Sequence, residues 1–219
     1  MPNKRQREQV CQNNPLFLTD MNDIPPPLPA APAPLTQRPD LSVKLATYQD
    51  PGRAPIKPNA KFLLAHPAHF IALGFGSGLS PFAPGTAGTL WAWLAYLALQ
   101  PWLTASQMGW LIGASAVVGW WACTVTAKNM AVADPGSIVW DEVVAFWLVL
   151  WLIMPTGFTG QLVAFALFRF FDAVKPGPVA WADKHFKGFN ARGGFGILFD
   201  DIVAAFCTLL VIAAWTFWR

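Results

Sequence analysis

The fold is decided by a long uncharged stretch, in which residues 87–127 read AGTLWAWLAYLALQPWLTASQMGWLIGASAVVGWWACTVTA. This stretch belongs to a longer run, from 62 to 127, that contains no Asp, Glu, Lys or Arg. A soluble fold needs polar side chains to face water, whereas a bilayer accommodates such a run. The whole chain is 54% hydrophobic and only 12% charged, and soluble domains carry roughly a quarter charged residues. We therefore expect an integral membrane protein.

Apolar segments predict an all-α fold, a polytopic membrane helical bundle of about five spans. A crossing needs roughly 20 apolar residues at about 1.5 Å of rise each. The predicted spans are 87–103, 105–127, 141–155, 160–173 and 200–218. The third and fourth are short, and they form either a tilted pair of spans or a partly inserted hairpin. Residues 62–79 predict a re-entrant or interfacial helix that stops at a Gly-rich loop.

The chain divides by composition into a tail and a membrane domain. Residues 1–60 hold 12 of the 20 prolines, and eight Lys or Arg residues occur up to Lys61. Such sequence buries too little apolar surface to fold, so we expect a disordered, Pro-rich, basic cytoplasmic tail. Residues 61–219 form the membrane-embedded domain. Cytoplasmic loops are rich in Lys and Arg, and this rule places the tail, Lys128 and the loop 175–199 on the cytoplasmic side.

The same topology places every acidic residue after position 60 on the cytoplasmic side. They are Asp134, Asp141, Glu142, Asp172, Asp183, Asp200 and Asp201. Segments 138–145 and 197–204 share a pattern of two aliphatics, an aromatic, two acids, two aliphatics and Ala, and each is expected to open an apolar helix. Acids at a helix start cap free N–H groups, at about 0.3–1 kcal/mol each. Capping accounts for one acid per helix, so metal binding explains the paired acids better.

Asp172 is expected at the C-terminal end of a helix, where the helix dipole disfavours negative charge. An ion pair with Arg169, three residues earlier, would explain it. A role in binding a metal or a substrate explains it equally well, because charge close to the membrane is costly and usually functional. Lys175 suits the same helix end, and as a point charge it also suits a phosphate.

The types of side chain present limit which metal ion and which class of reaction the site would suit. Carboxylates without His or Cys favour Mg²⁺ first and Mn²⁺ second. Residues 74–89 are rich in glycine and hydroxyl side chains, and their N–H groups are suited to cradle an anion. Together these features suggest phosphoryl transfer or phosphate-ester hydrolysis at the cytoplasmic leaflet.

Several motifs follow one another along the membrane domain, at 74–81, 84–86, 136–142, 168–169, Asp172, 175–176, 193–194, 196–197 and 200–204. At these motifs the sequence resembles the phosphatidylglycerophosphatase A family. The resemblance covers about residues 65–215 and leaves out the tail, and residues 186–191 look like a small insertion. It implies a Mg²⁺-dependent, multi-pass enzyme of the bacterial inner membrane that converts phosphatidylglycerophosphate to phosphatidylglycerol.

The resulting hypothesis assigns a role to each candidate residue. Catalysis is assigned to Asp141, Glu142, Asp172, Lys175, Asp200 and Asp201. The expected metal ligands among these are Asp141, Asp172, Asp200 and Asp201. Substrate binding is assigned to Ser77, Ser80, Thr86 and Arg169, while Lys175 contacts the phosphate. A remaining carboxylate, Glu142 or Asp201, orients or deprotonates water; direct attack by water and an aspartyl-phosphate intermediate both stay open.

Other classes fit less well. A divalent-cation transporter also uses membrane carboxylates near broken helices, but its ligands belong near the midplane. A CDP-alcohol phosphotransferase-like enzyme lacks its spaced Asp-Gly signature here, and a scaffold leaves the acids unexplained. The expected partner is a phospholipid substrate in the membrane. The formal charge of +3 does not suggest nucleic acid, and the oligomeric state stays open.

Overall fold

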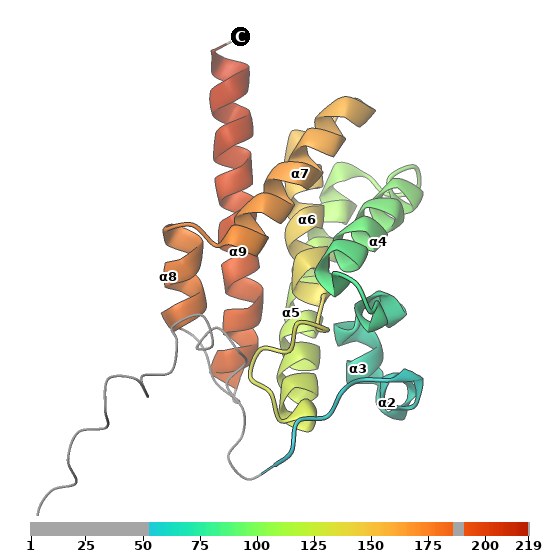
Figure 1. The fold of residues 1–219 in the computed structure, drawn as a ribbon. Helices are drawn as coiled ribbons and strands as arrows, with labels where there is room; N and C mark the ends of the chain where they lie inside the picture. The colour runs from blue at the N-terminus through green and yellow to red at the C-terminus, as the bar shows by residue number, and fades with distance from the viewer. Residues whose placement is uncertain (1–52, 186–190, 219) are drawn as a thin grey trace, which may run out of the picture. The chain divides into compact units, whose positions relative to one another are not determined.

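The computed structural model describes residues 53–185 and 191–218, and every regular element in these ranges is helical. The predicted all-α class is therefore confirmed for the described residues (Figure 1). Most of the predicted tail and of the predicted insertion at 186–191 lies outside them. The elements in order are α2 (Ala60–Ala65), α3 (Pro67–Ala72), a 3₁₀ segment (Gly74–Leu79), α4 (Pro84–Leu99), α5 (Ala105–Met130), α6 (Trp140–Ile153), α7 (Phe158–Val174), α8 (Pro178–His185) and α9 (Ala191–Phe217).

The predicted helix over 62–79 is wrong as a single helix, because the chain breaks twice within it. His66 is extended, with φ −155°, and its Nδ1 accepts a hydrogen bond of 3.1 Å from the N–H of Ala68. Pro67 then starts α3, a position at which its missing N–H costs nothing. The Gly-rich part follows as a 3₁₀ segment interrupted at Phe75 and Gly76, whose φ angles are 55° and 103°. The expected stop at a Gly-rich loop is thus present.

Each of the five predicted spans overlaps one helix, but the helices differ in length. Among the described residues, α5 and α9 are long and apolar enough to cross a membrane, with mean hydropathies of 1.4 and 2.3. Helices α4, α6 and α7 contain 16, 14 and 17 residues. A capping box fixes the start of α5, because Thr104 Oγ1 accepts from the N–H of Gln107 and the Gln107 side chain accepts from the N–H of Thr104.

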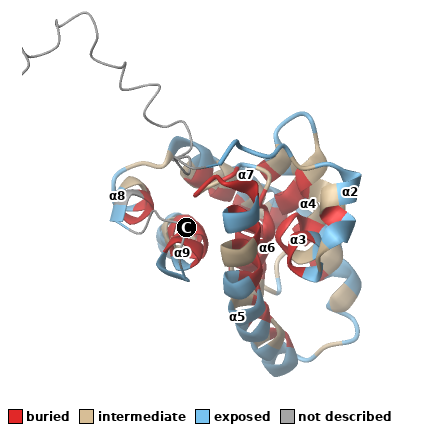
Figure 2. Ribbon diagram, turned by 90° about the horizontal axis from the view of Figure 1, so that it is seen from below, coloured by how far each residue is buried: buried red, intermediate tan, exposed pale blue. Residues whose placement is uncertain are grey.

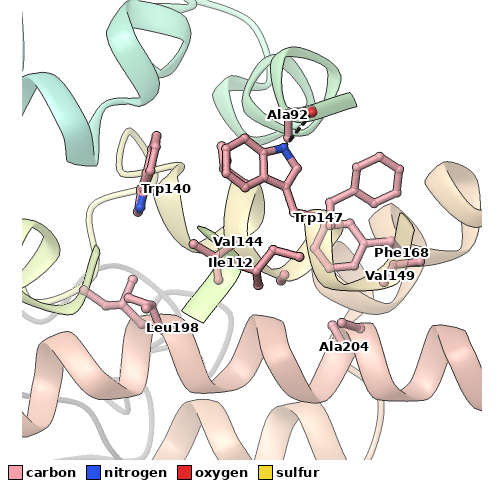
Figure 3. Close-up of a cluster of buried hydrophobic side chains, with 14 of the residues drawn as sticks. Ala92, Ile112, Trp140, Val144, Trp147, Val149, Phe168, Leu198 and Ala204 are labelled. Atoms are coloured by element: carbon pink, nitrogen blue, oxygen red, sulfur yellow. Dashed lines mark hydrogen bonds between the residues drawn. The ribbon is translucent and has the colours of Figure 1, made fainter. Parts of the chain in front are cut away.

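Helix α6 lies at the centre of the bundle and contacts α4, α5, α7 and α9. Its residues are buried almost throughout (Figure 2). Phe146 and Leu150 are fully enclosed. The indole of Trp147 donates a hydrogen bond of 2.8 Å to the carbonyl of Ala92 in α4 (Figure 3). This bond satisfies the one polar group of a large buried side chain. The core therefore holds the start of α6 firmly against its neighbours.

Helix α9 begins at Ala191, nine residues before the predicted span at 200. Its first turns pack on α5, where Gly194 lies so close to Thr124 that a Cβ would overlap the hydroxyl. The indole of Trp120 also donates a hydrogen bond of 2.6 Å to the carbonyl of Ala191. The expectation that Asp200 and Asp201 open a helix is therefore wrong, because both lie inside α9.

Candidate active site

Three carboxylates from three helices converge in the interior. Glu142 lies in the first turn of α6, Asp172 in the last turn of α7 and Asp201 in the middle of α9. One oxygen from each lies within 4.8 Å of the other two. The residues are only 8%, 9% and 3% exposed, respectively. We call these three residues the carboxylate cluster.

Arg169 connects two members of the carboxylate cluster. Its Nη1 donates hydrogen bonds to Glu142 Oε1 at 2.9 Å and to Asp172 Oδ2 at 2.5 Å. A weaker contact of 3.3 Å reaches Thr89 Oγ1 on α4. The predicted pair of Arg169 and Asp172 is thus present, and the same guanidinium also serves Glu142. One cation cannot neutralise three carboxylates, so the cluster keeps a deficit of positive charge.

The start of α4 lies directly against Glu142. A Cβ on Gly85 would overlap Glu142 Oε1 and would come within 2.9 Å of Arg169 Nη2. A Cβ on Gly88 would lie 2.9 Å from Glu142 Oε2 and 2.6 Å from the Cβ of Val139. These two glycines therefore permit the backbone of α4 to approach the carboxylate cluster closely.

A second group of charges surrounds Lys175. Its Nζ donates hydrogen bonds to Asp183 Oδ1 on α8 at 2.8 Å and to Asp200 Oδ2 on α9 at 2.5 Å. Burial alone would lower the pKa of this ammonium group, but the nearby carboxylates, Asp200 first and then Asp134 and Asp183, raise the pKa above its usual range. Lys175 is therefore positively charged at any physiological pH. Its backbone is left-handed, with φ 47°, and it ends α7.

Asp141 lies beside both groups of charges. It is 9% exposed, and it interacts electrostatically with Glu142, Asp200 and Asp134. Its Oδ1 atom is buried and has no hydrogen-bond partner among the described residues. Asp141 is therefore available as a further acid next to the carboxylate cluster.

The donor set fits a hard divalent cation. Within the described ranges, buried oxygens with no hydrogen-bond partner occur on Glu142 (Oε2), Asp201 (Oδ2) and Asp200 (Oδ1), as well as on Asp141. A buried carboxylate oxygen without a partner is costly, and a bound cation removes that cost. Carboxylate oxygens are the ligands that Mg²⁺ prefers.

The structure groups the sequence-predicted residues differently from the hypothesis. Of the four expected metal ligands, Asp172 and Asp201 belong to the carboxylate cluster. Glu142 completes it in place of Asp141, and Asp200 pairs with Lys175. The division arises because successive acids on a helix point about 100° apart, so only one of each pair faces the same centre.

Two of the three hydroxyl residues assigned to substrate binding donate hydrogen bonds within their own loop. Ser77 Oγ donates to the carbonyl of Gly74 at 2.8 Å, and Ser80 Oγ donates to the carbonyl of Phe82 at 2.8 Å. Thr86 is exposed on the first turn of α4, next to Gly85. Of these three residues, Thr86 is the one next to a residue that contacts the carboxylate cluster, and its side chain is exposed.

Sequence reasoning placed Gly85 and Gly88 in a loop suited to cradle an anion, but it missed their close approach to Glu142, and it missed Asp183 as part of the site. For the two glycines a signal was present, because they are spaced three residues apart at the start of an otherwise bulky, Trp-rich segment. No sequence pattern indicated Asp183, because a single acid in a short polar segment is expected to be exposed to solvent. Only the packing of α8 on α9 places it against Lys175.

Together, the apolar helices and the buried acids beside an arginine and a lysine define a helical enzyme suited to phosphate-ester chemistry. The phosphatidylglycerophosphatase A family model matches residues 70–216. The chain belongs to this family, whose members are phosphoric monoester hydrolases. The resemblance noted in the sequence is thereby confirmed.

Individual relatives are similar over most of their length. Phosphatidylglycerophosphatase A of Escherichia coli K12 is 38% identical over 150 residues, which are 66% of this chain and 81% of the relative. The protein of the same name from Haemophilus influenzae is 38% identical over 161 residues, 74% of this chain and 96% of the relative. A Bacteroides thetaiotaomicron protein named "Putative phosphatidylinositol-3-phosphatase" is 39% identical over 150 residues, 65% of this chain and 89% of the relative. No solved structure matches the chain.

Proposed function

We propose that this protein is a Mg²⁺-dependent lipid phosphatase that hydrolyses phosphatidylglycerophosphate to phosphatidylglycerol and phosphate at the cytoplasmic leaflet. The substrate follows from the names of two relatives that are each 38% identical to the chain. The phospholipid would be bound in the bacterial inner membrane, where the apolar helices α5 and α9 are long enough to anchor the protein.

The observation that carries the proposal is the carboxylate cluster with its unsatisfied oxygens. Glu142, Asp172 and Asp201 would hold Mg²⁺, and the buried Oε2 of Glu142 and Oδ2 of Asp201 lack other partners among the described residues. When bound, the ion would offset the charge of the phosphate group and lower the pKa of a bound water. This chemistry would take place among buried side chains, where electrostatic interactions are stronger than in bulk water.

The chain's own residues supply orientation and charge around that position. Arg169 fixes the carboxylates of Glu142 and Asp172, so that both are held in place before a substrate arrives. Lys175 keeps its positive charge and would bind a phosphate oxygen as a point charge. Because Glu142 and Asp201 would hold the metal, the role of proton acceptor that the sequence hypothesis gave to one of them passes to Asp141. Its buried Oδ1, which has no hydrogen-bond partner among the described residues, would accept the proton of the attacking water.

The cytoplasmic orientation rests on the distribution of positive charge. Lys128 lies in the last turn of α5, Lys175 follows the last residue of α7, and Arg192 lies in the first turn of α9. Loops rich in Lys and Arg face the cytoplasm. The active site would therefore face the cytoplasm.

The test is phosphate release by the purified full-length chain in detergent micelles. The substrates are phosphatidylglycerophosphate, phosphatidylinositol 3-phosphate and phosphatidic acid, each with Mg²⁺ and with EDTA. We expect release from phosphatidylglycerophosphate that depends on Mg²⁺. Faster release from phosphatidylinositol 3-phosphate would reassign the substrate, and undiminished release in EDTA would refute the role of the metal.

A matched pair of variants links the activity to the carboxylate cluster. Asp172→Asn removes one negative charge from the cluster with almost no change in volume. Asp40→Asn makes the same change outside the residues that the family model matches. We expect Asp172→Asn to abolish phosphate release and Asp40→Asn to leave it unchanged. Full activity in Asp172→Asn would remove that residue from the site.

A further inference from the structure

An apolar groove runs between α7 and the C-terminal half of α9. Its walls include Val163 and Leu167 on α7 and Phe206, Leu210 and Ala213 on α9, and the end of α6 also lines it. Among the described residues, those that line it include no charged side chain, and its few polar groups are threonine hydroxyls and the indole N–H of Trp215. The groove is therefore suited to a hydrocarbon chain.

The groove begins about one and a half helical turns from the candidate active site, along both α7 and α9. Leu167 lies five residues before Asp172 on α7, and Phe206 lies five residues after Asp201 on α9. Five helical residues correspond to about 7.5 Å along the axis. A lipid phosphate held at the carboxylate cluster would therefore place its glycerol backbone over this interval and its acyl chain at the start of the groove.

The length of the groove matches half of a bilayer. Its wall on α9 extends from Phe206 to Thr216, and these residues span about 15 Å at 1.5 Å each. The hydrocarbon core of a bilayer is about 30 Å thick, so one leaflet contributes about 15 Å.

The side chains of the groove are open to the outside of the bundle. Val163, Phe206 and Leu210 are 49%, 53% and 69% exposed, although all three are large and apolar. We propose that the groove binds an acyl chain of the same lipid whose phosphate occupies the carboxylate cluster. This assignment rests on the proposed function, and it adds a specificity site for the lipid tail.

Photolabelling tests the groove without a measurement of activity. Vesicles would contain phosphatidylglycerophosphate or phosphatidylcholine that carries the same diazirine-bearing acyl chain, and the labelled residues would be mapped by mass spectrometry. We expect several-fold more label on 163–167 and 206–213 from the phosphorylated lipid. Equal labelling by both lipids would show that bulk membrane lipid fills the groove, and absence of label there would show that no acyl chain binds. Either result overturns the proposal.

Matched variants test the same site through kinetics. Ala213→Trp and Val163→Trp fill the groove from its two walls, whereas Ala214→Trp and Leu162→Trp change neighbouring residues that do not line it. For the groove variants we expect the KM for long-chain substrate to rise about tenfold, equivalent to about 1.4 kcal/mol. Their KM for a dihexanoyl substrate and their kcat should stay unchanged.

Three kinetic outcomes have distinct meanings. Equal effects of groove and control variants would overturn the assignment, as would equal effects on long-chain and short-chain substrates. If the unmodified protein released no phosphate from any lipid, the proposed function would fail. The photolabelling result would still decide whether a phosphorylated lipid occupies the groove.

Discussion

Replacement of Arg169 by methionine is expected to destabilise the folded protein strongly, because the buried carboxylate cluster loses its positive partner. The guanidinium is bonded to both Glu142 and Asp172, and the three side chains are only 18%, 10% and 12% exposed. Removal of one partner from a buried ion pair costs about 3–5 kcal/mol, because the remaining charge has no compensation. We expect a loss near the lower limit, about 3 kcal/mol, since Arg169 is partly accessible. For a chain of this size, that loss corresponds to a decrease in Tm of about 6–12 °C.

The assay is thermal unfolding in detergent micelles, followed by near-UV circular dichroism in EDTA and in Mg²⁺. In EDTA, Arg169→Met should unfold at a lower temperature than the unmodified protein. Mg²⁺ should restore more stability to the variant than to the unmodified protein, because a bound cation replaces part of the missing positive charge. Arg192→Met, at an exposed arginine, serves as the control.

A double variant separates charge compensation from simple loss of packing. Glu142→Gln should recover part of the stability of Arg169→Met, because it removes one of the carboxylates left without a partner. If Arg169→Met unfolded in EDTA at the same temperature as the unmodified protein, the ion pairs of Arg169 would contribute nothing to stability and the prediction would be refuted. An unchanged response to Mg²⁺ would contradict the assignment of the cluster as a cation site.

Three further predictions concern other parts of the site. Gly85→Ala should abolish activity and lower stability by about 1–3 kcal/mol through overpacking against Glu142. The control Gly113→Ala, where a Cβ meets nothing within 4 Å, should leave activity intact in the same phosphate-release and unfolding assays. Lys175→Met should reduce kcat/KM about 10–100-fold, because a hydrogen bond to a charged group contributes about 1.5–3 kcal/mol. An unchanged kcat/KM would exclude contact between Lys175 and the phosphate. Asp201→Asn should abolish the increase in Tm that Mg²⁺ gives the unmodified protein, and a retained increase would place the ion elsewhere.

Most of the helices are predictable from the sequence because apolar length and turn residues are local signals. The pairs Pro101 and Thr104, and Pro155 and Gly157, indicate turns, and helices end or begin next to them. The start of α9 is not predictable in this way, because its first turns contain several glycines and Arg192, which resemble a loop. Packing of Gly194 against α5 overrides that local preference.

The composition of the site is predictable, but its internal grouping is not. Apart from Asp183, the acids stand out by their charge in an apolar context and by the family motifs, as do Arg169 and Lys175. Which acid of each pair faces Arg169 depends on the rotation of α6 and α9, and that rotation is set by the packing of side chains in the core. The roles of Gly85 and Gly88 likewise emerge only when α4 is placed against Glu142.

The position of Asp200 and Asp201 inside α9 limits how an anion can be recognised. In the middle of a helix every backbone N–H is already bonded to a carbonyl one turn earlier, so α9 offers no amide group to a phosphate there. Glu142, in the first turn of α6, adjoins N–H groups that have no such partner within the helix. The two similar sequence segments are therefore not interchangeable, and only the segment on α6 combines an acid with main-chain donors.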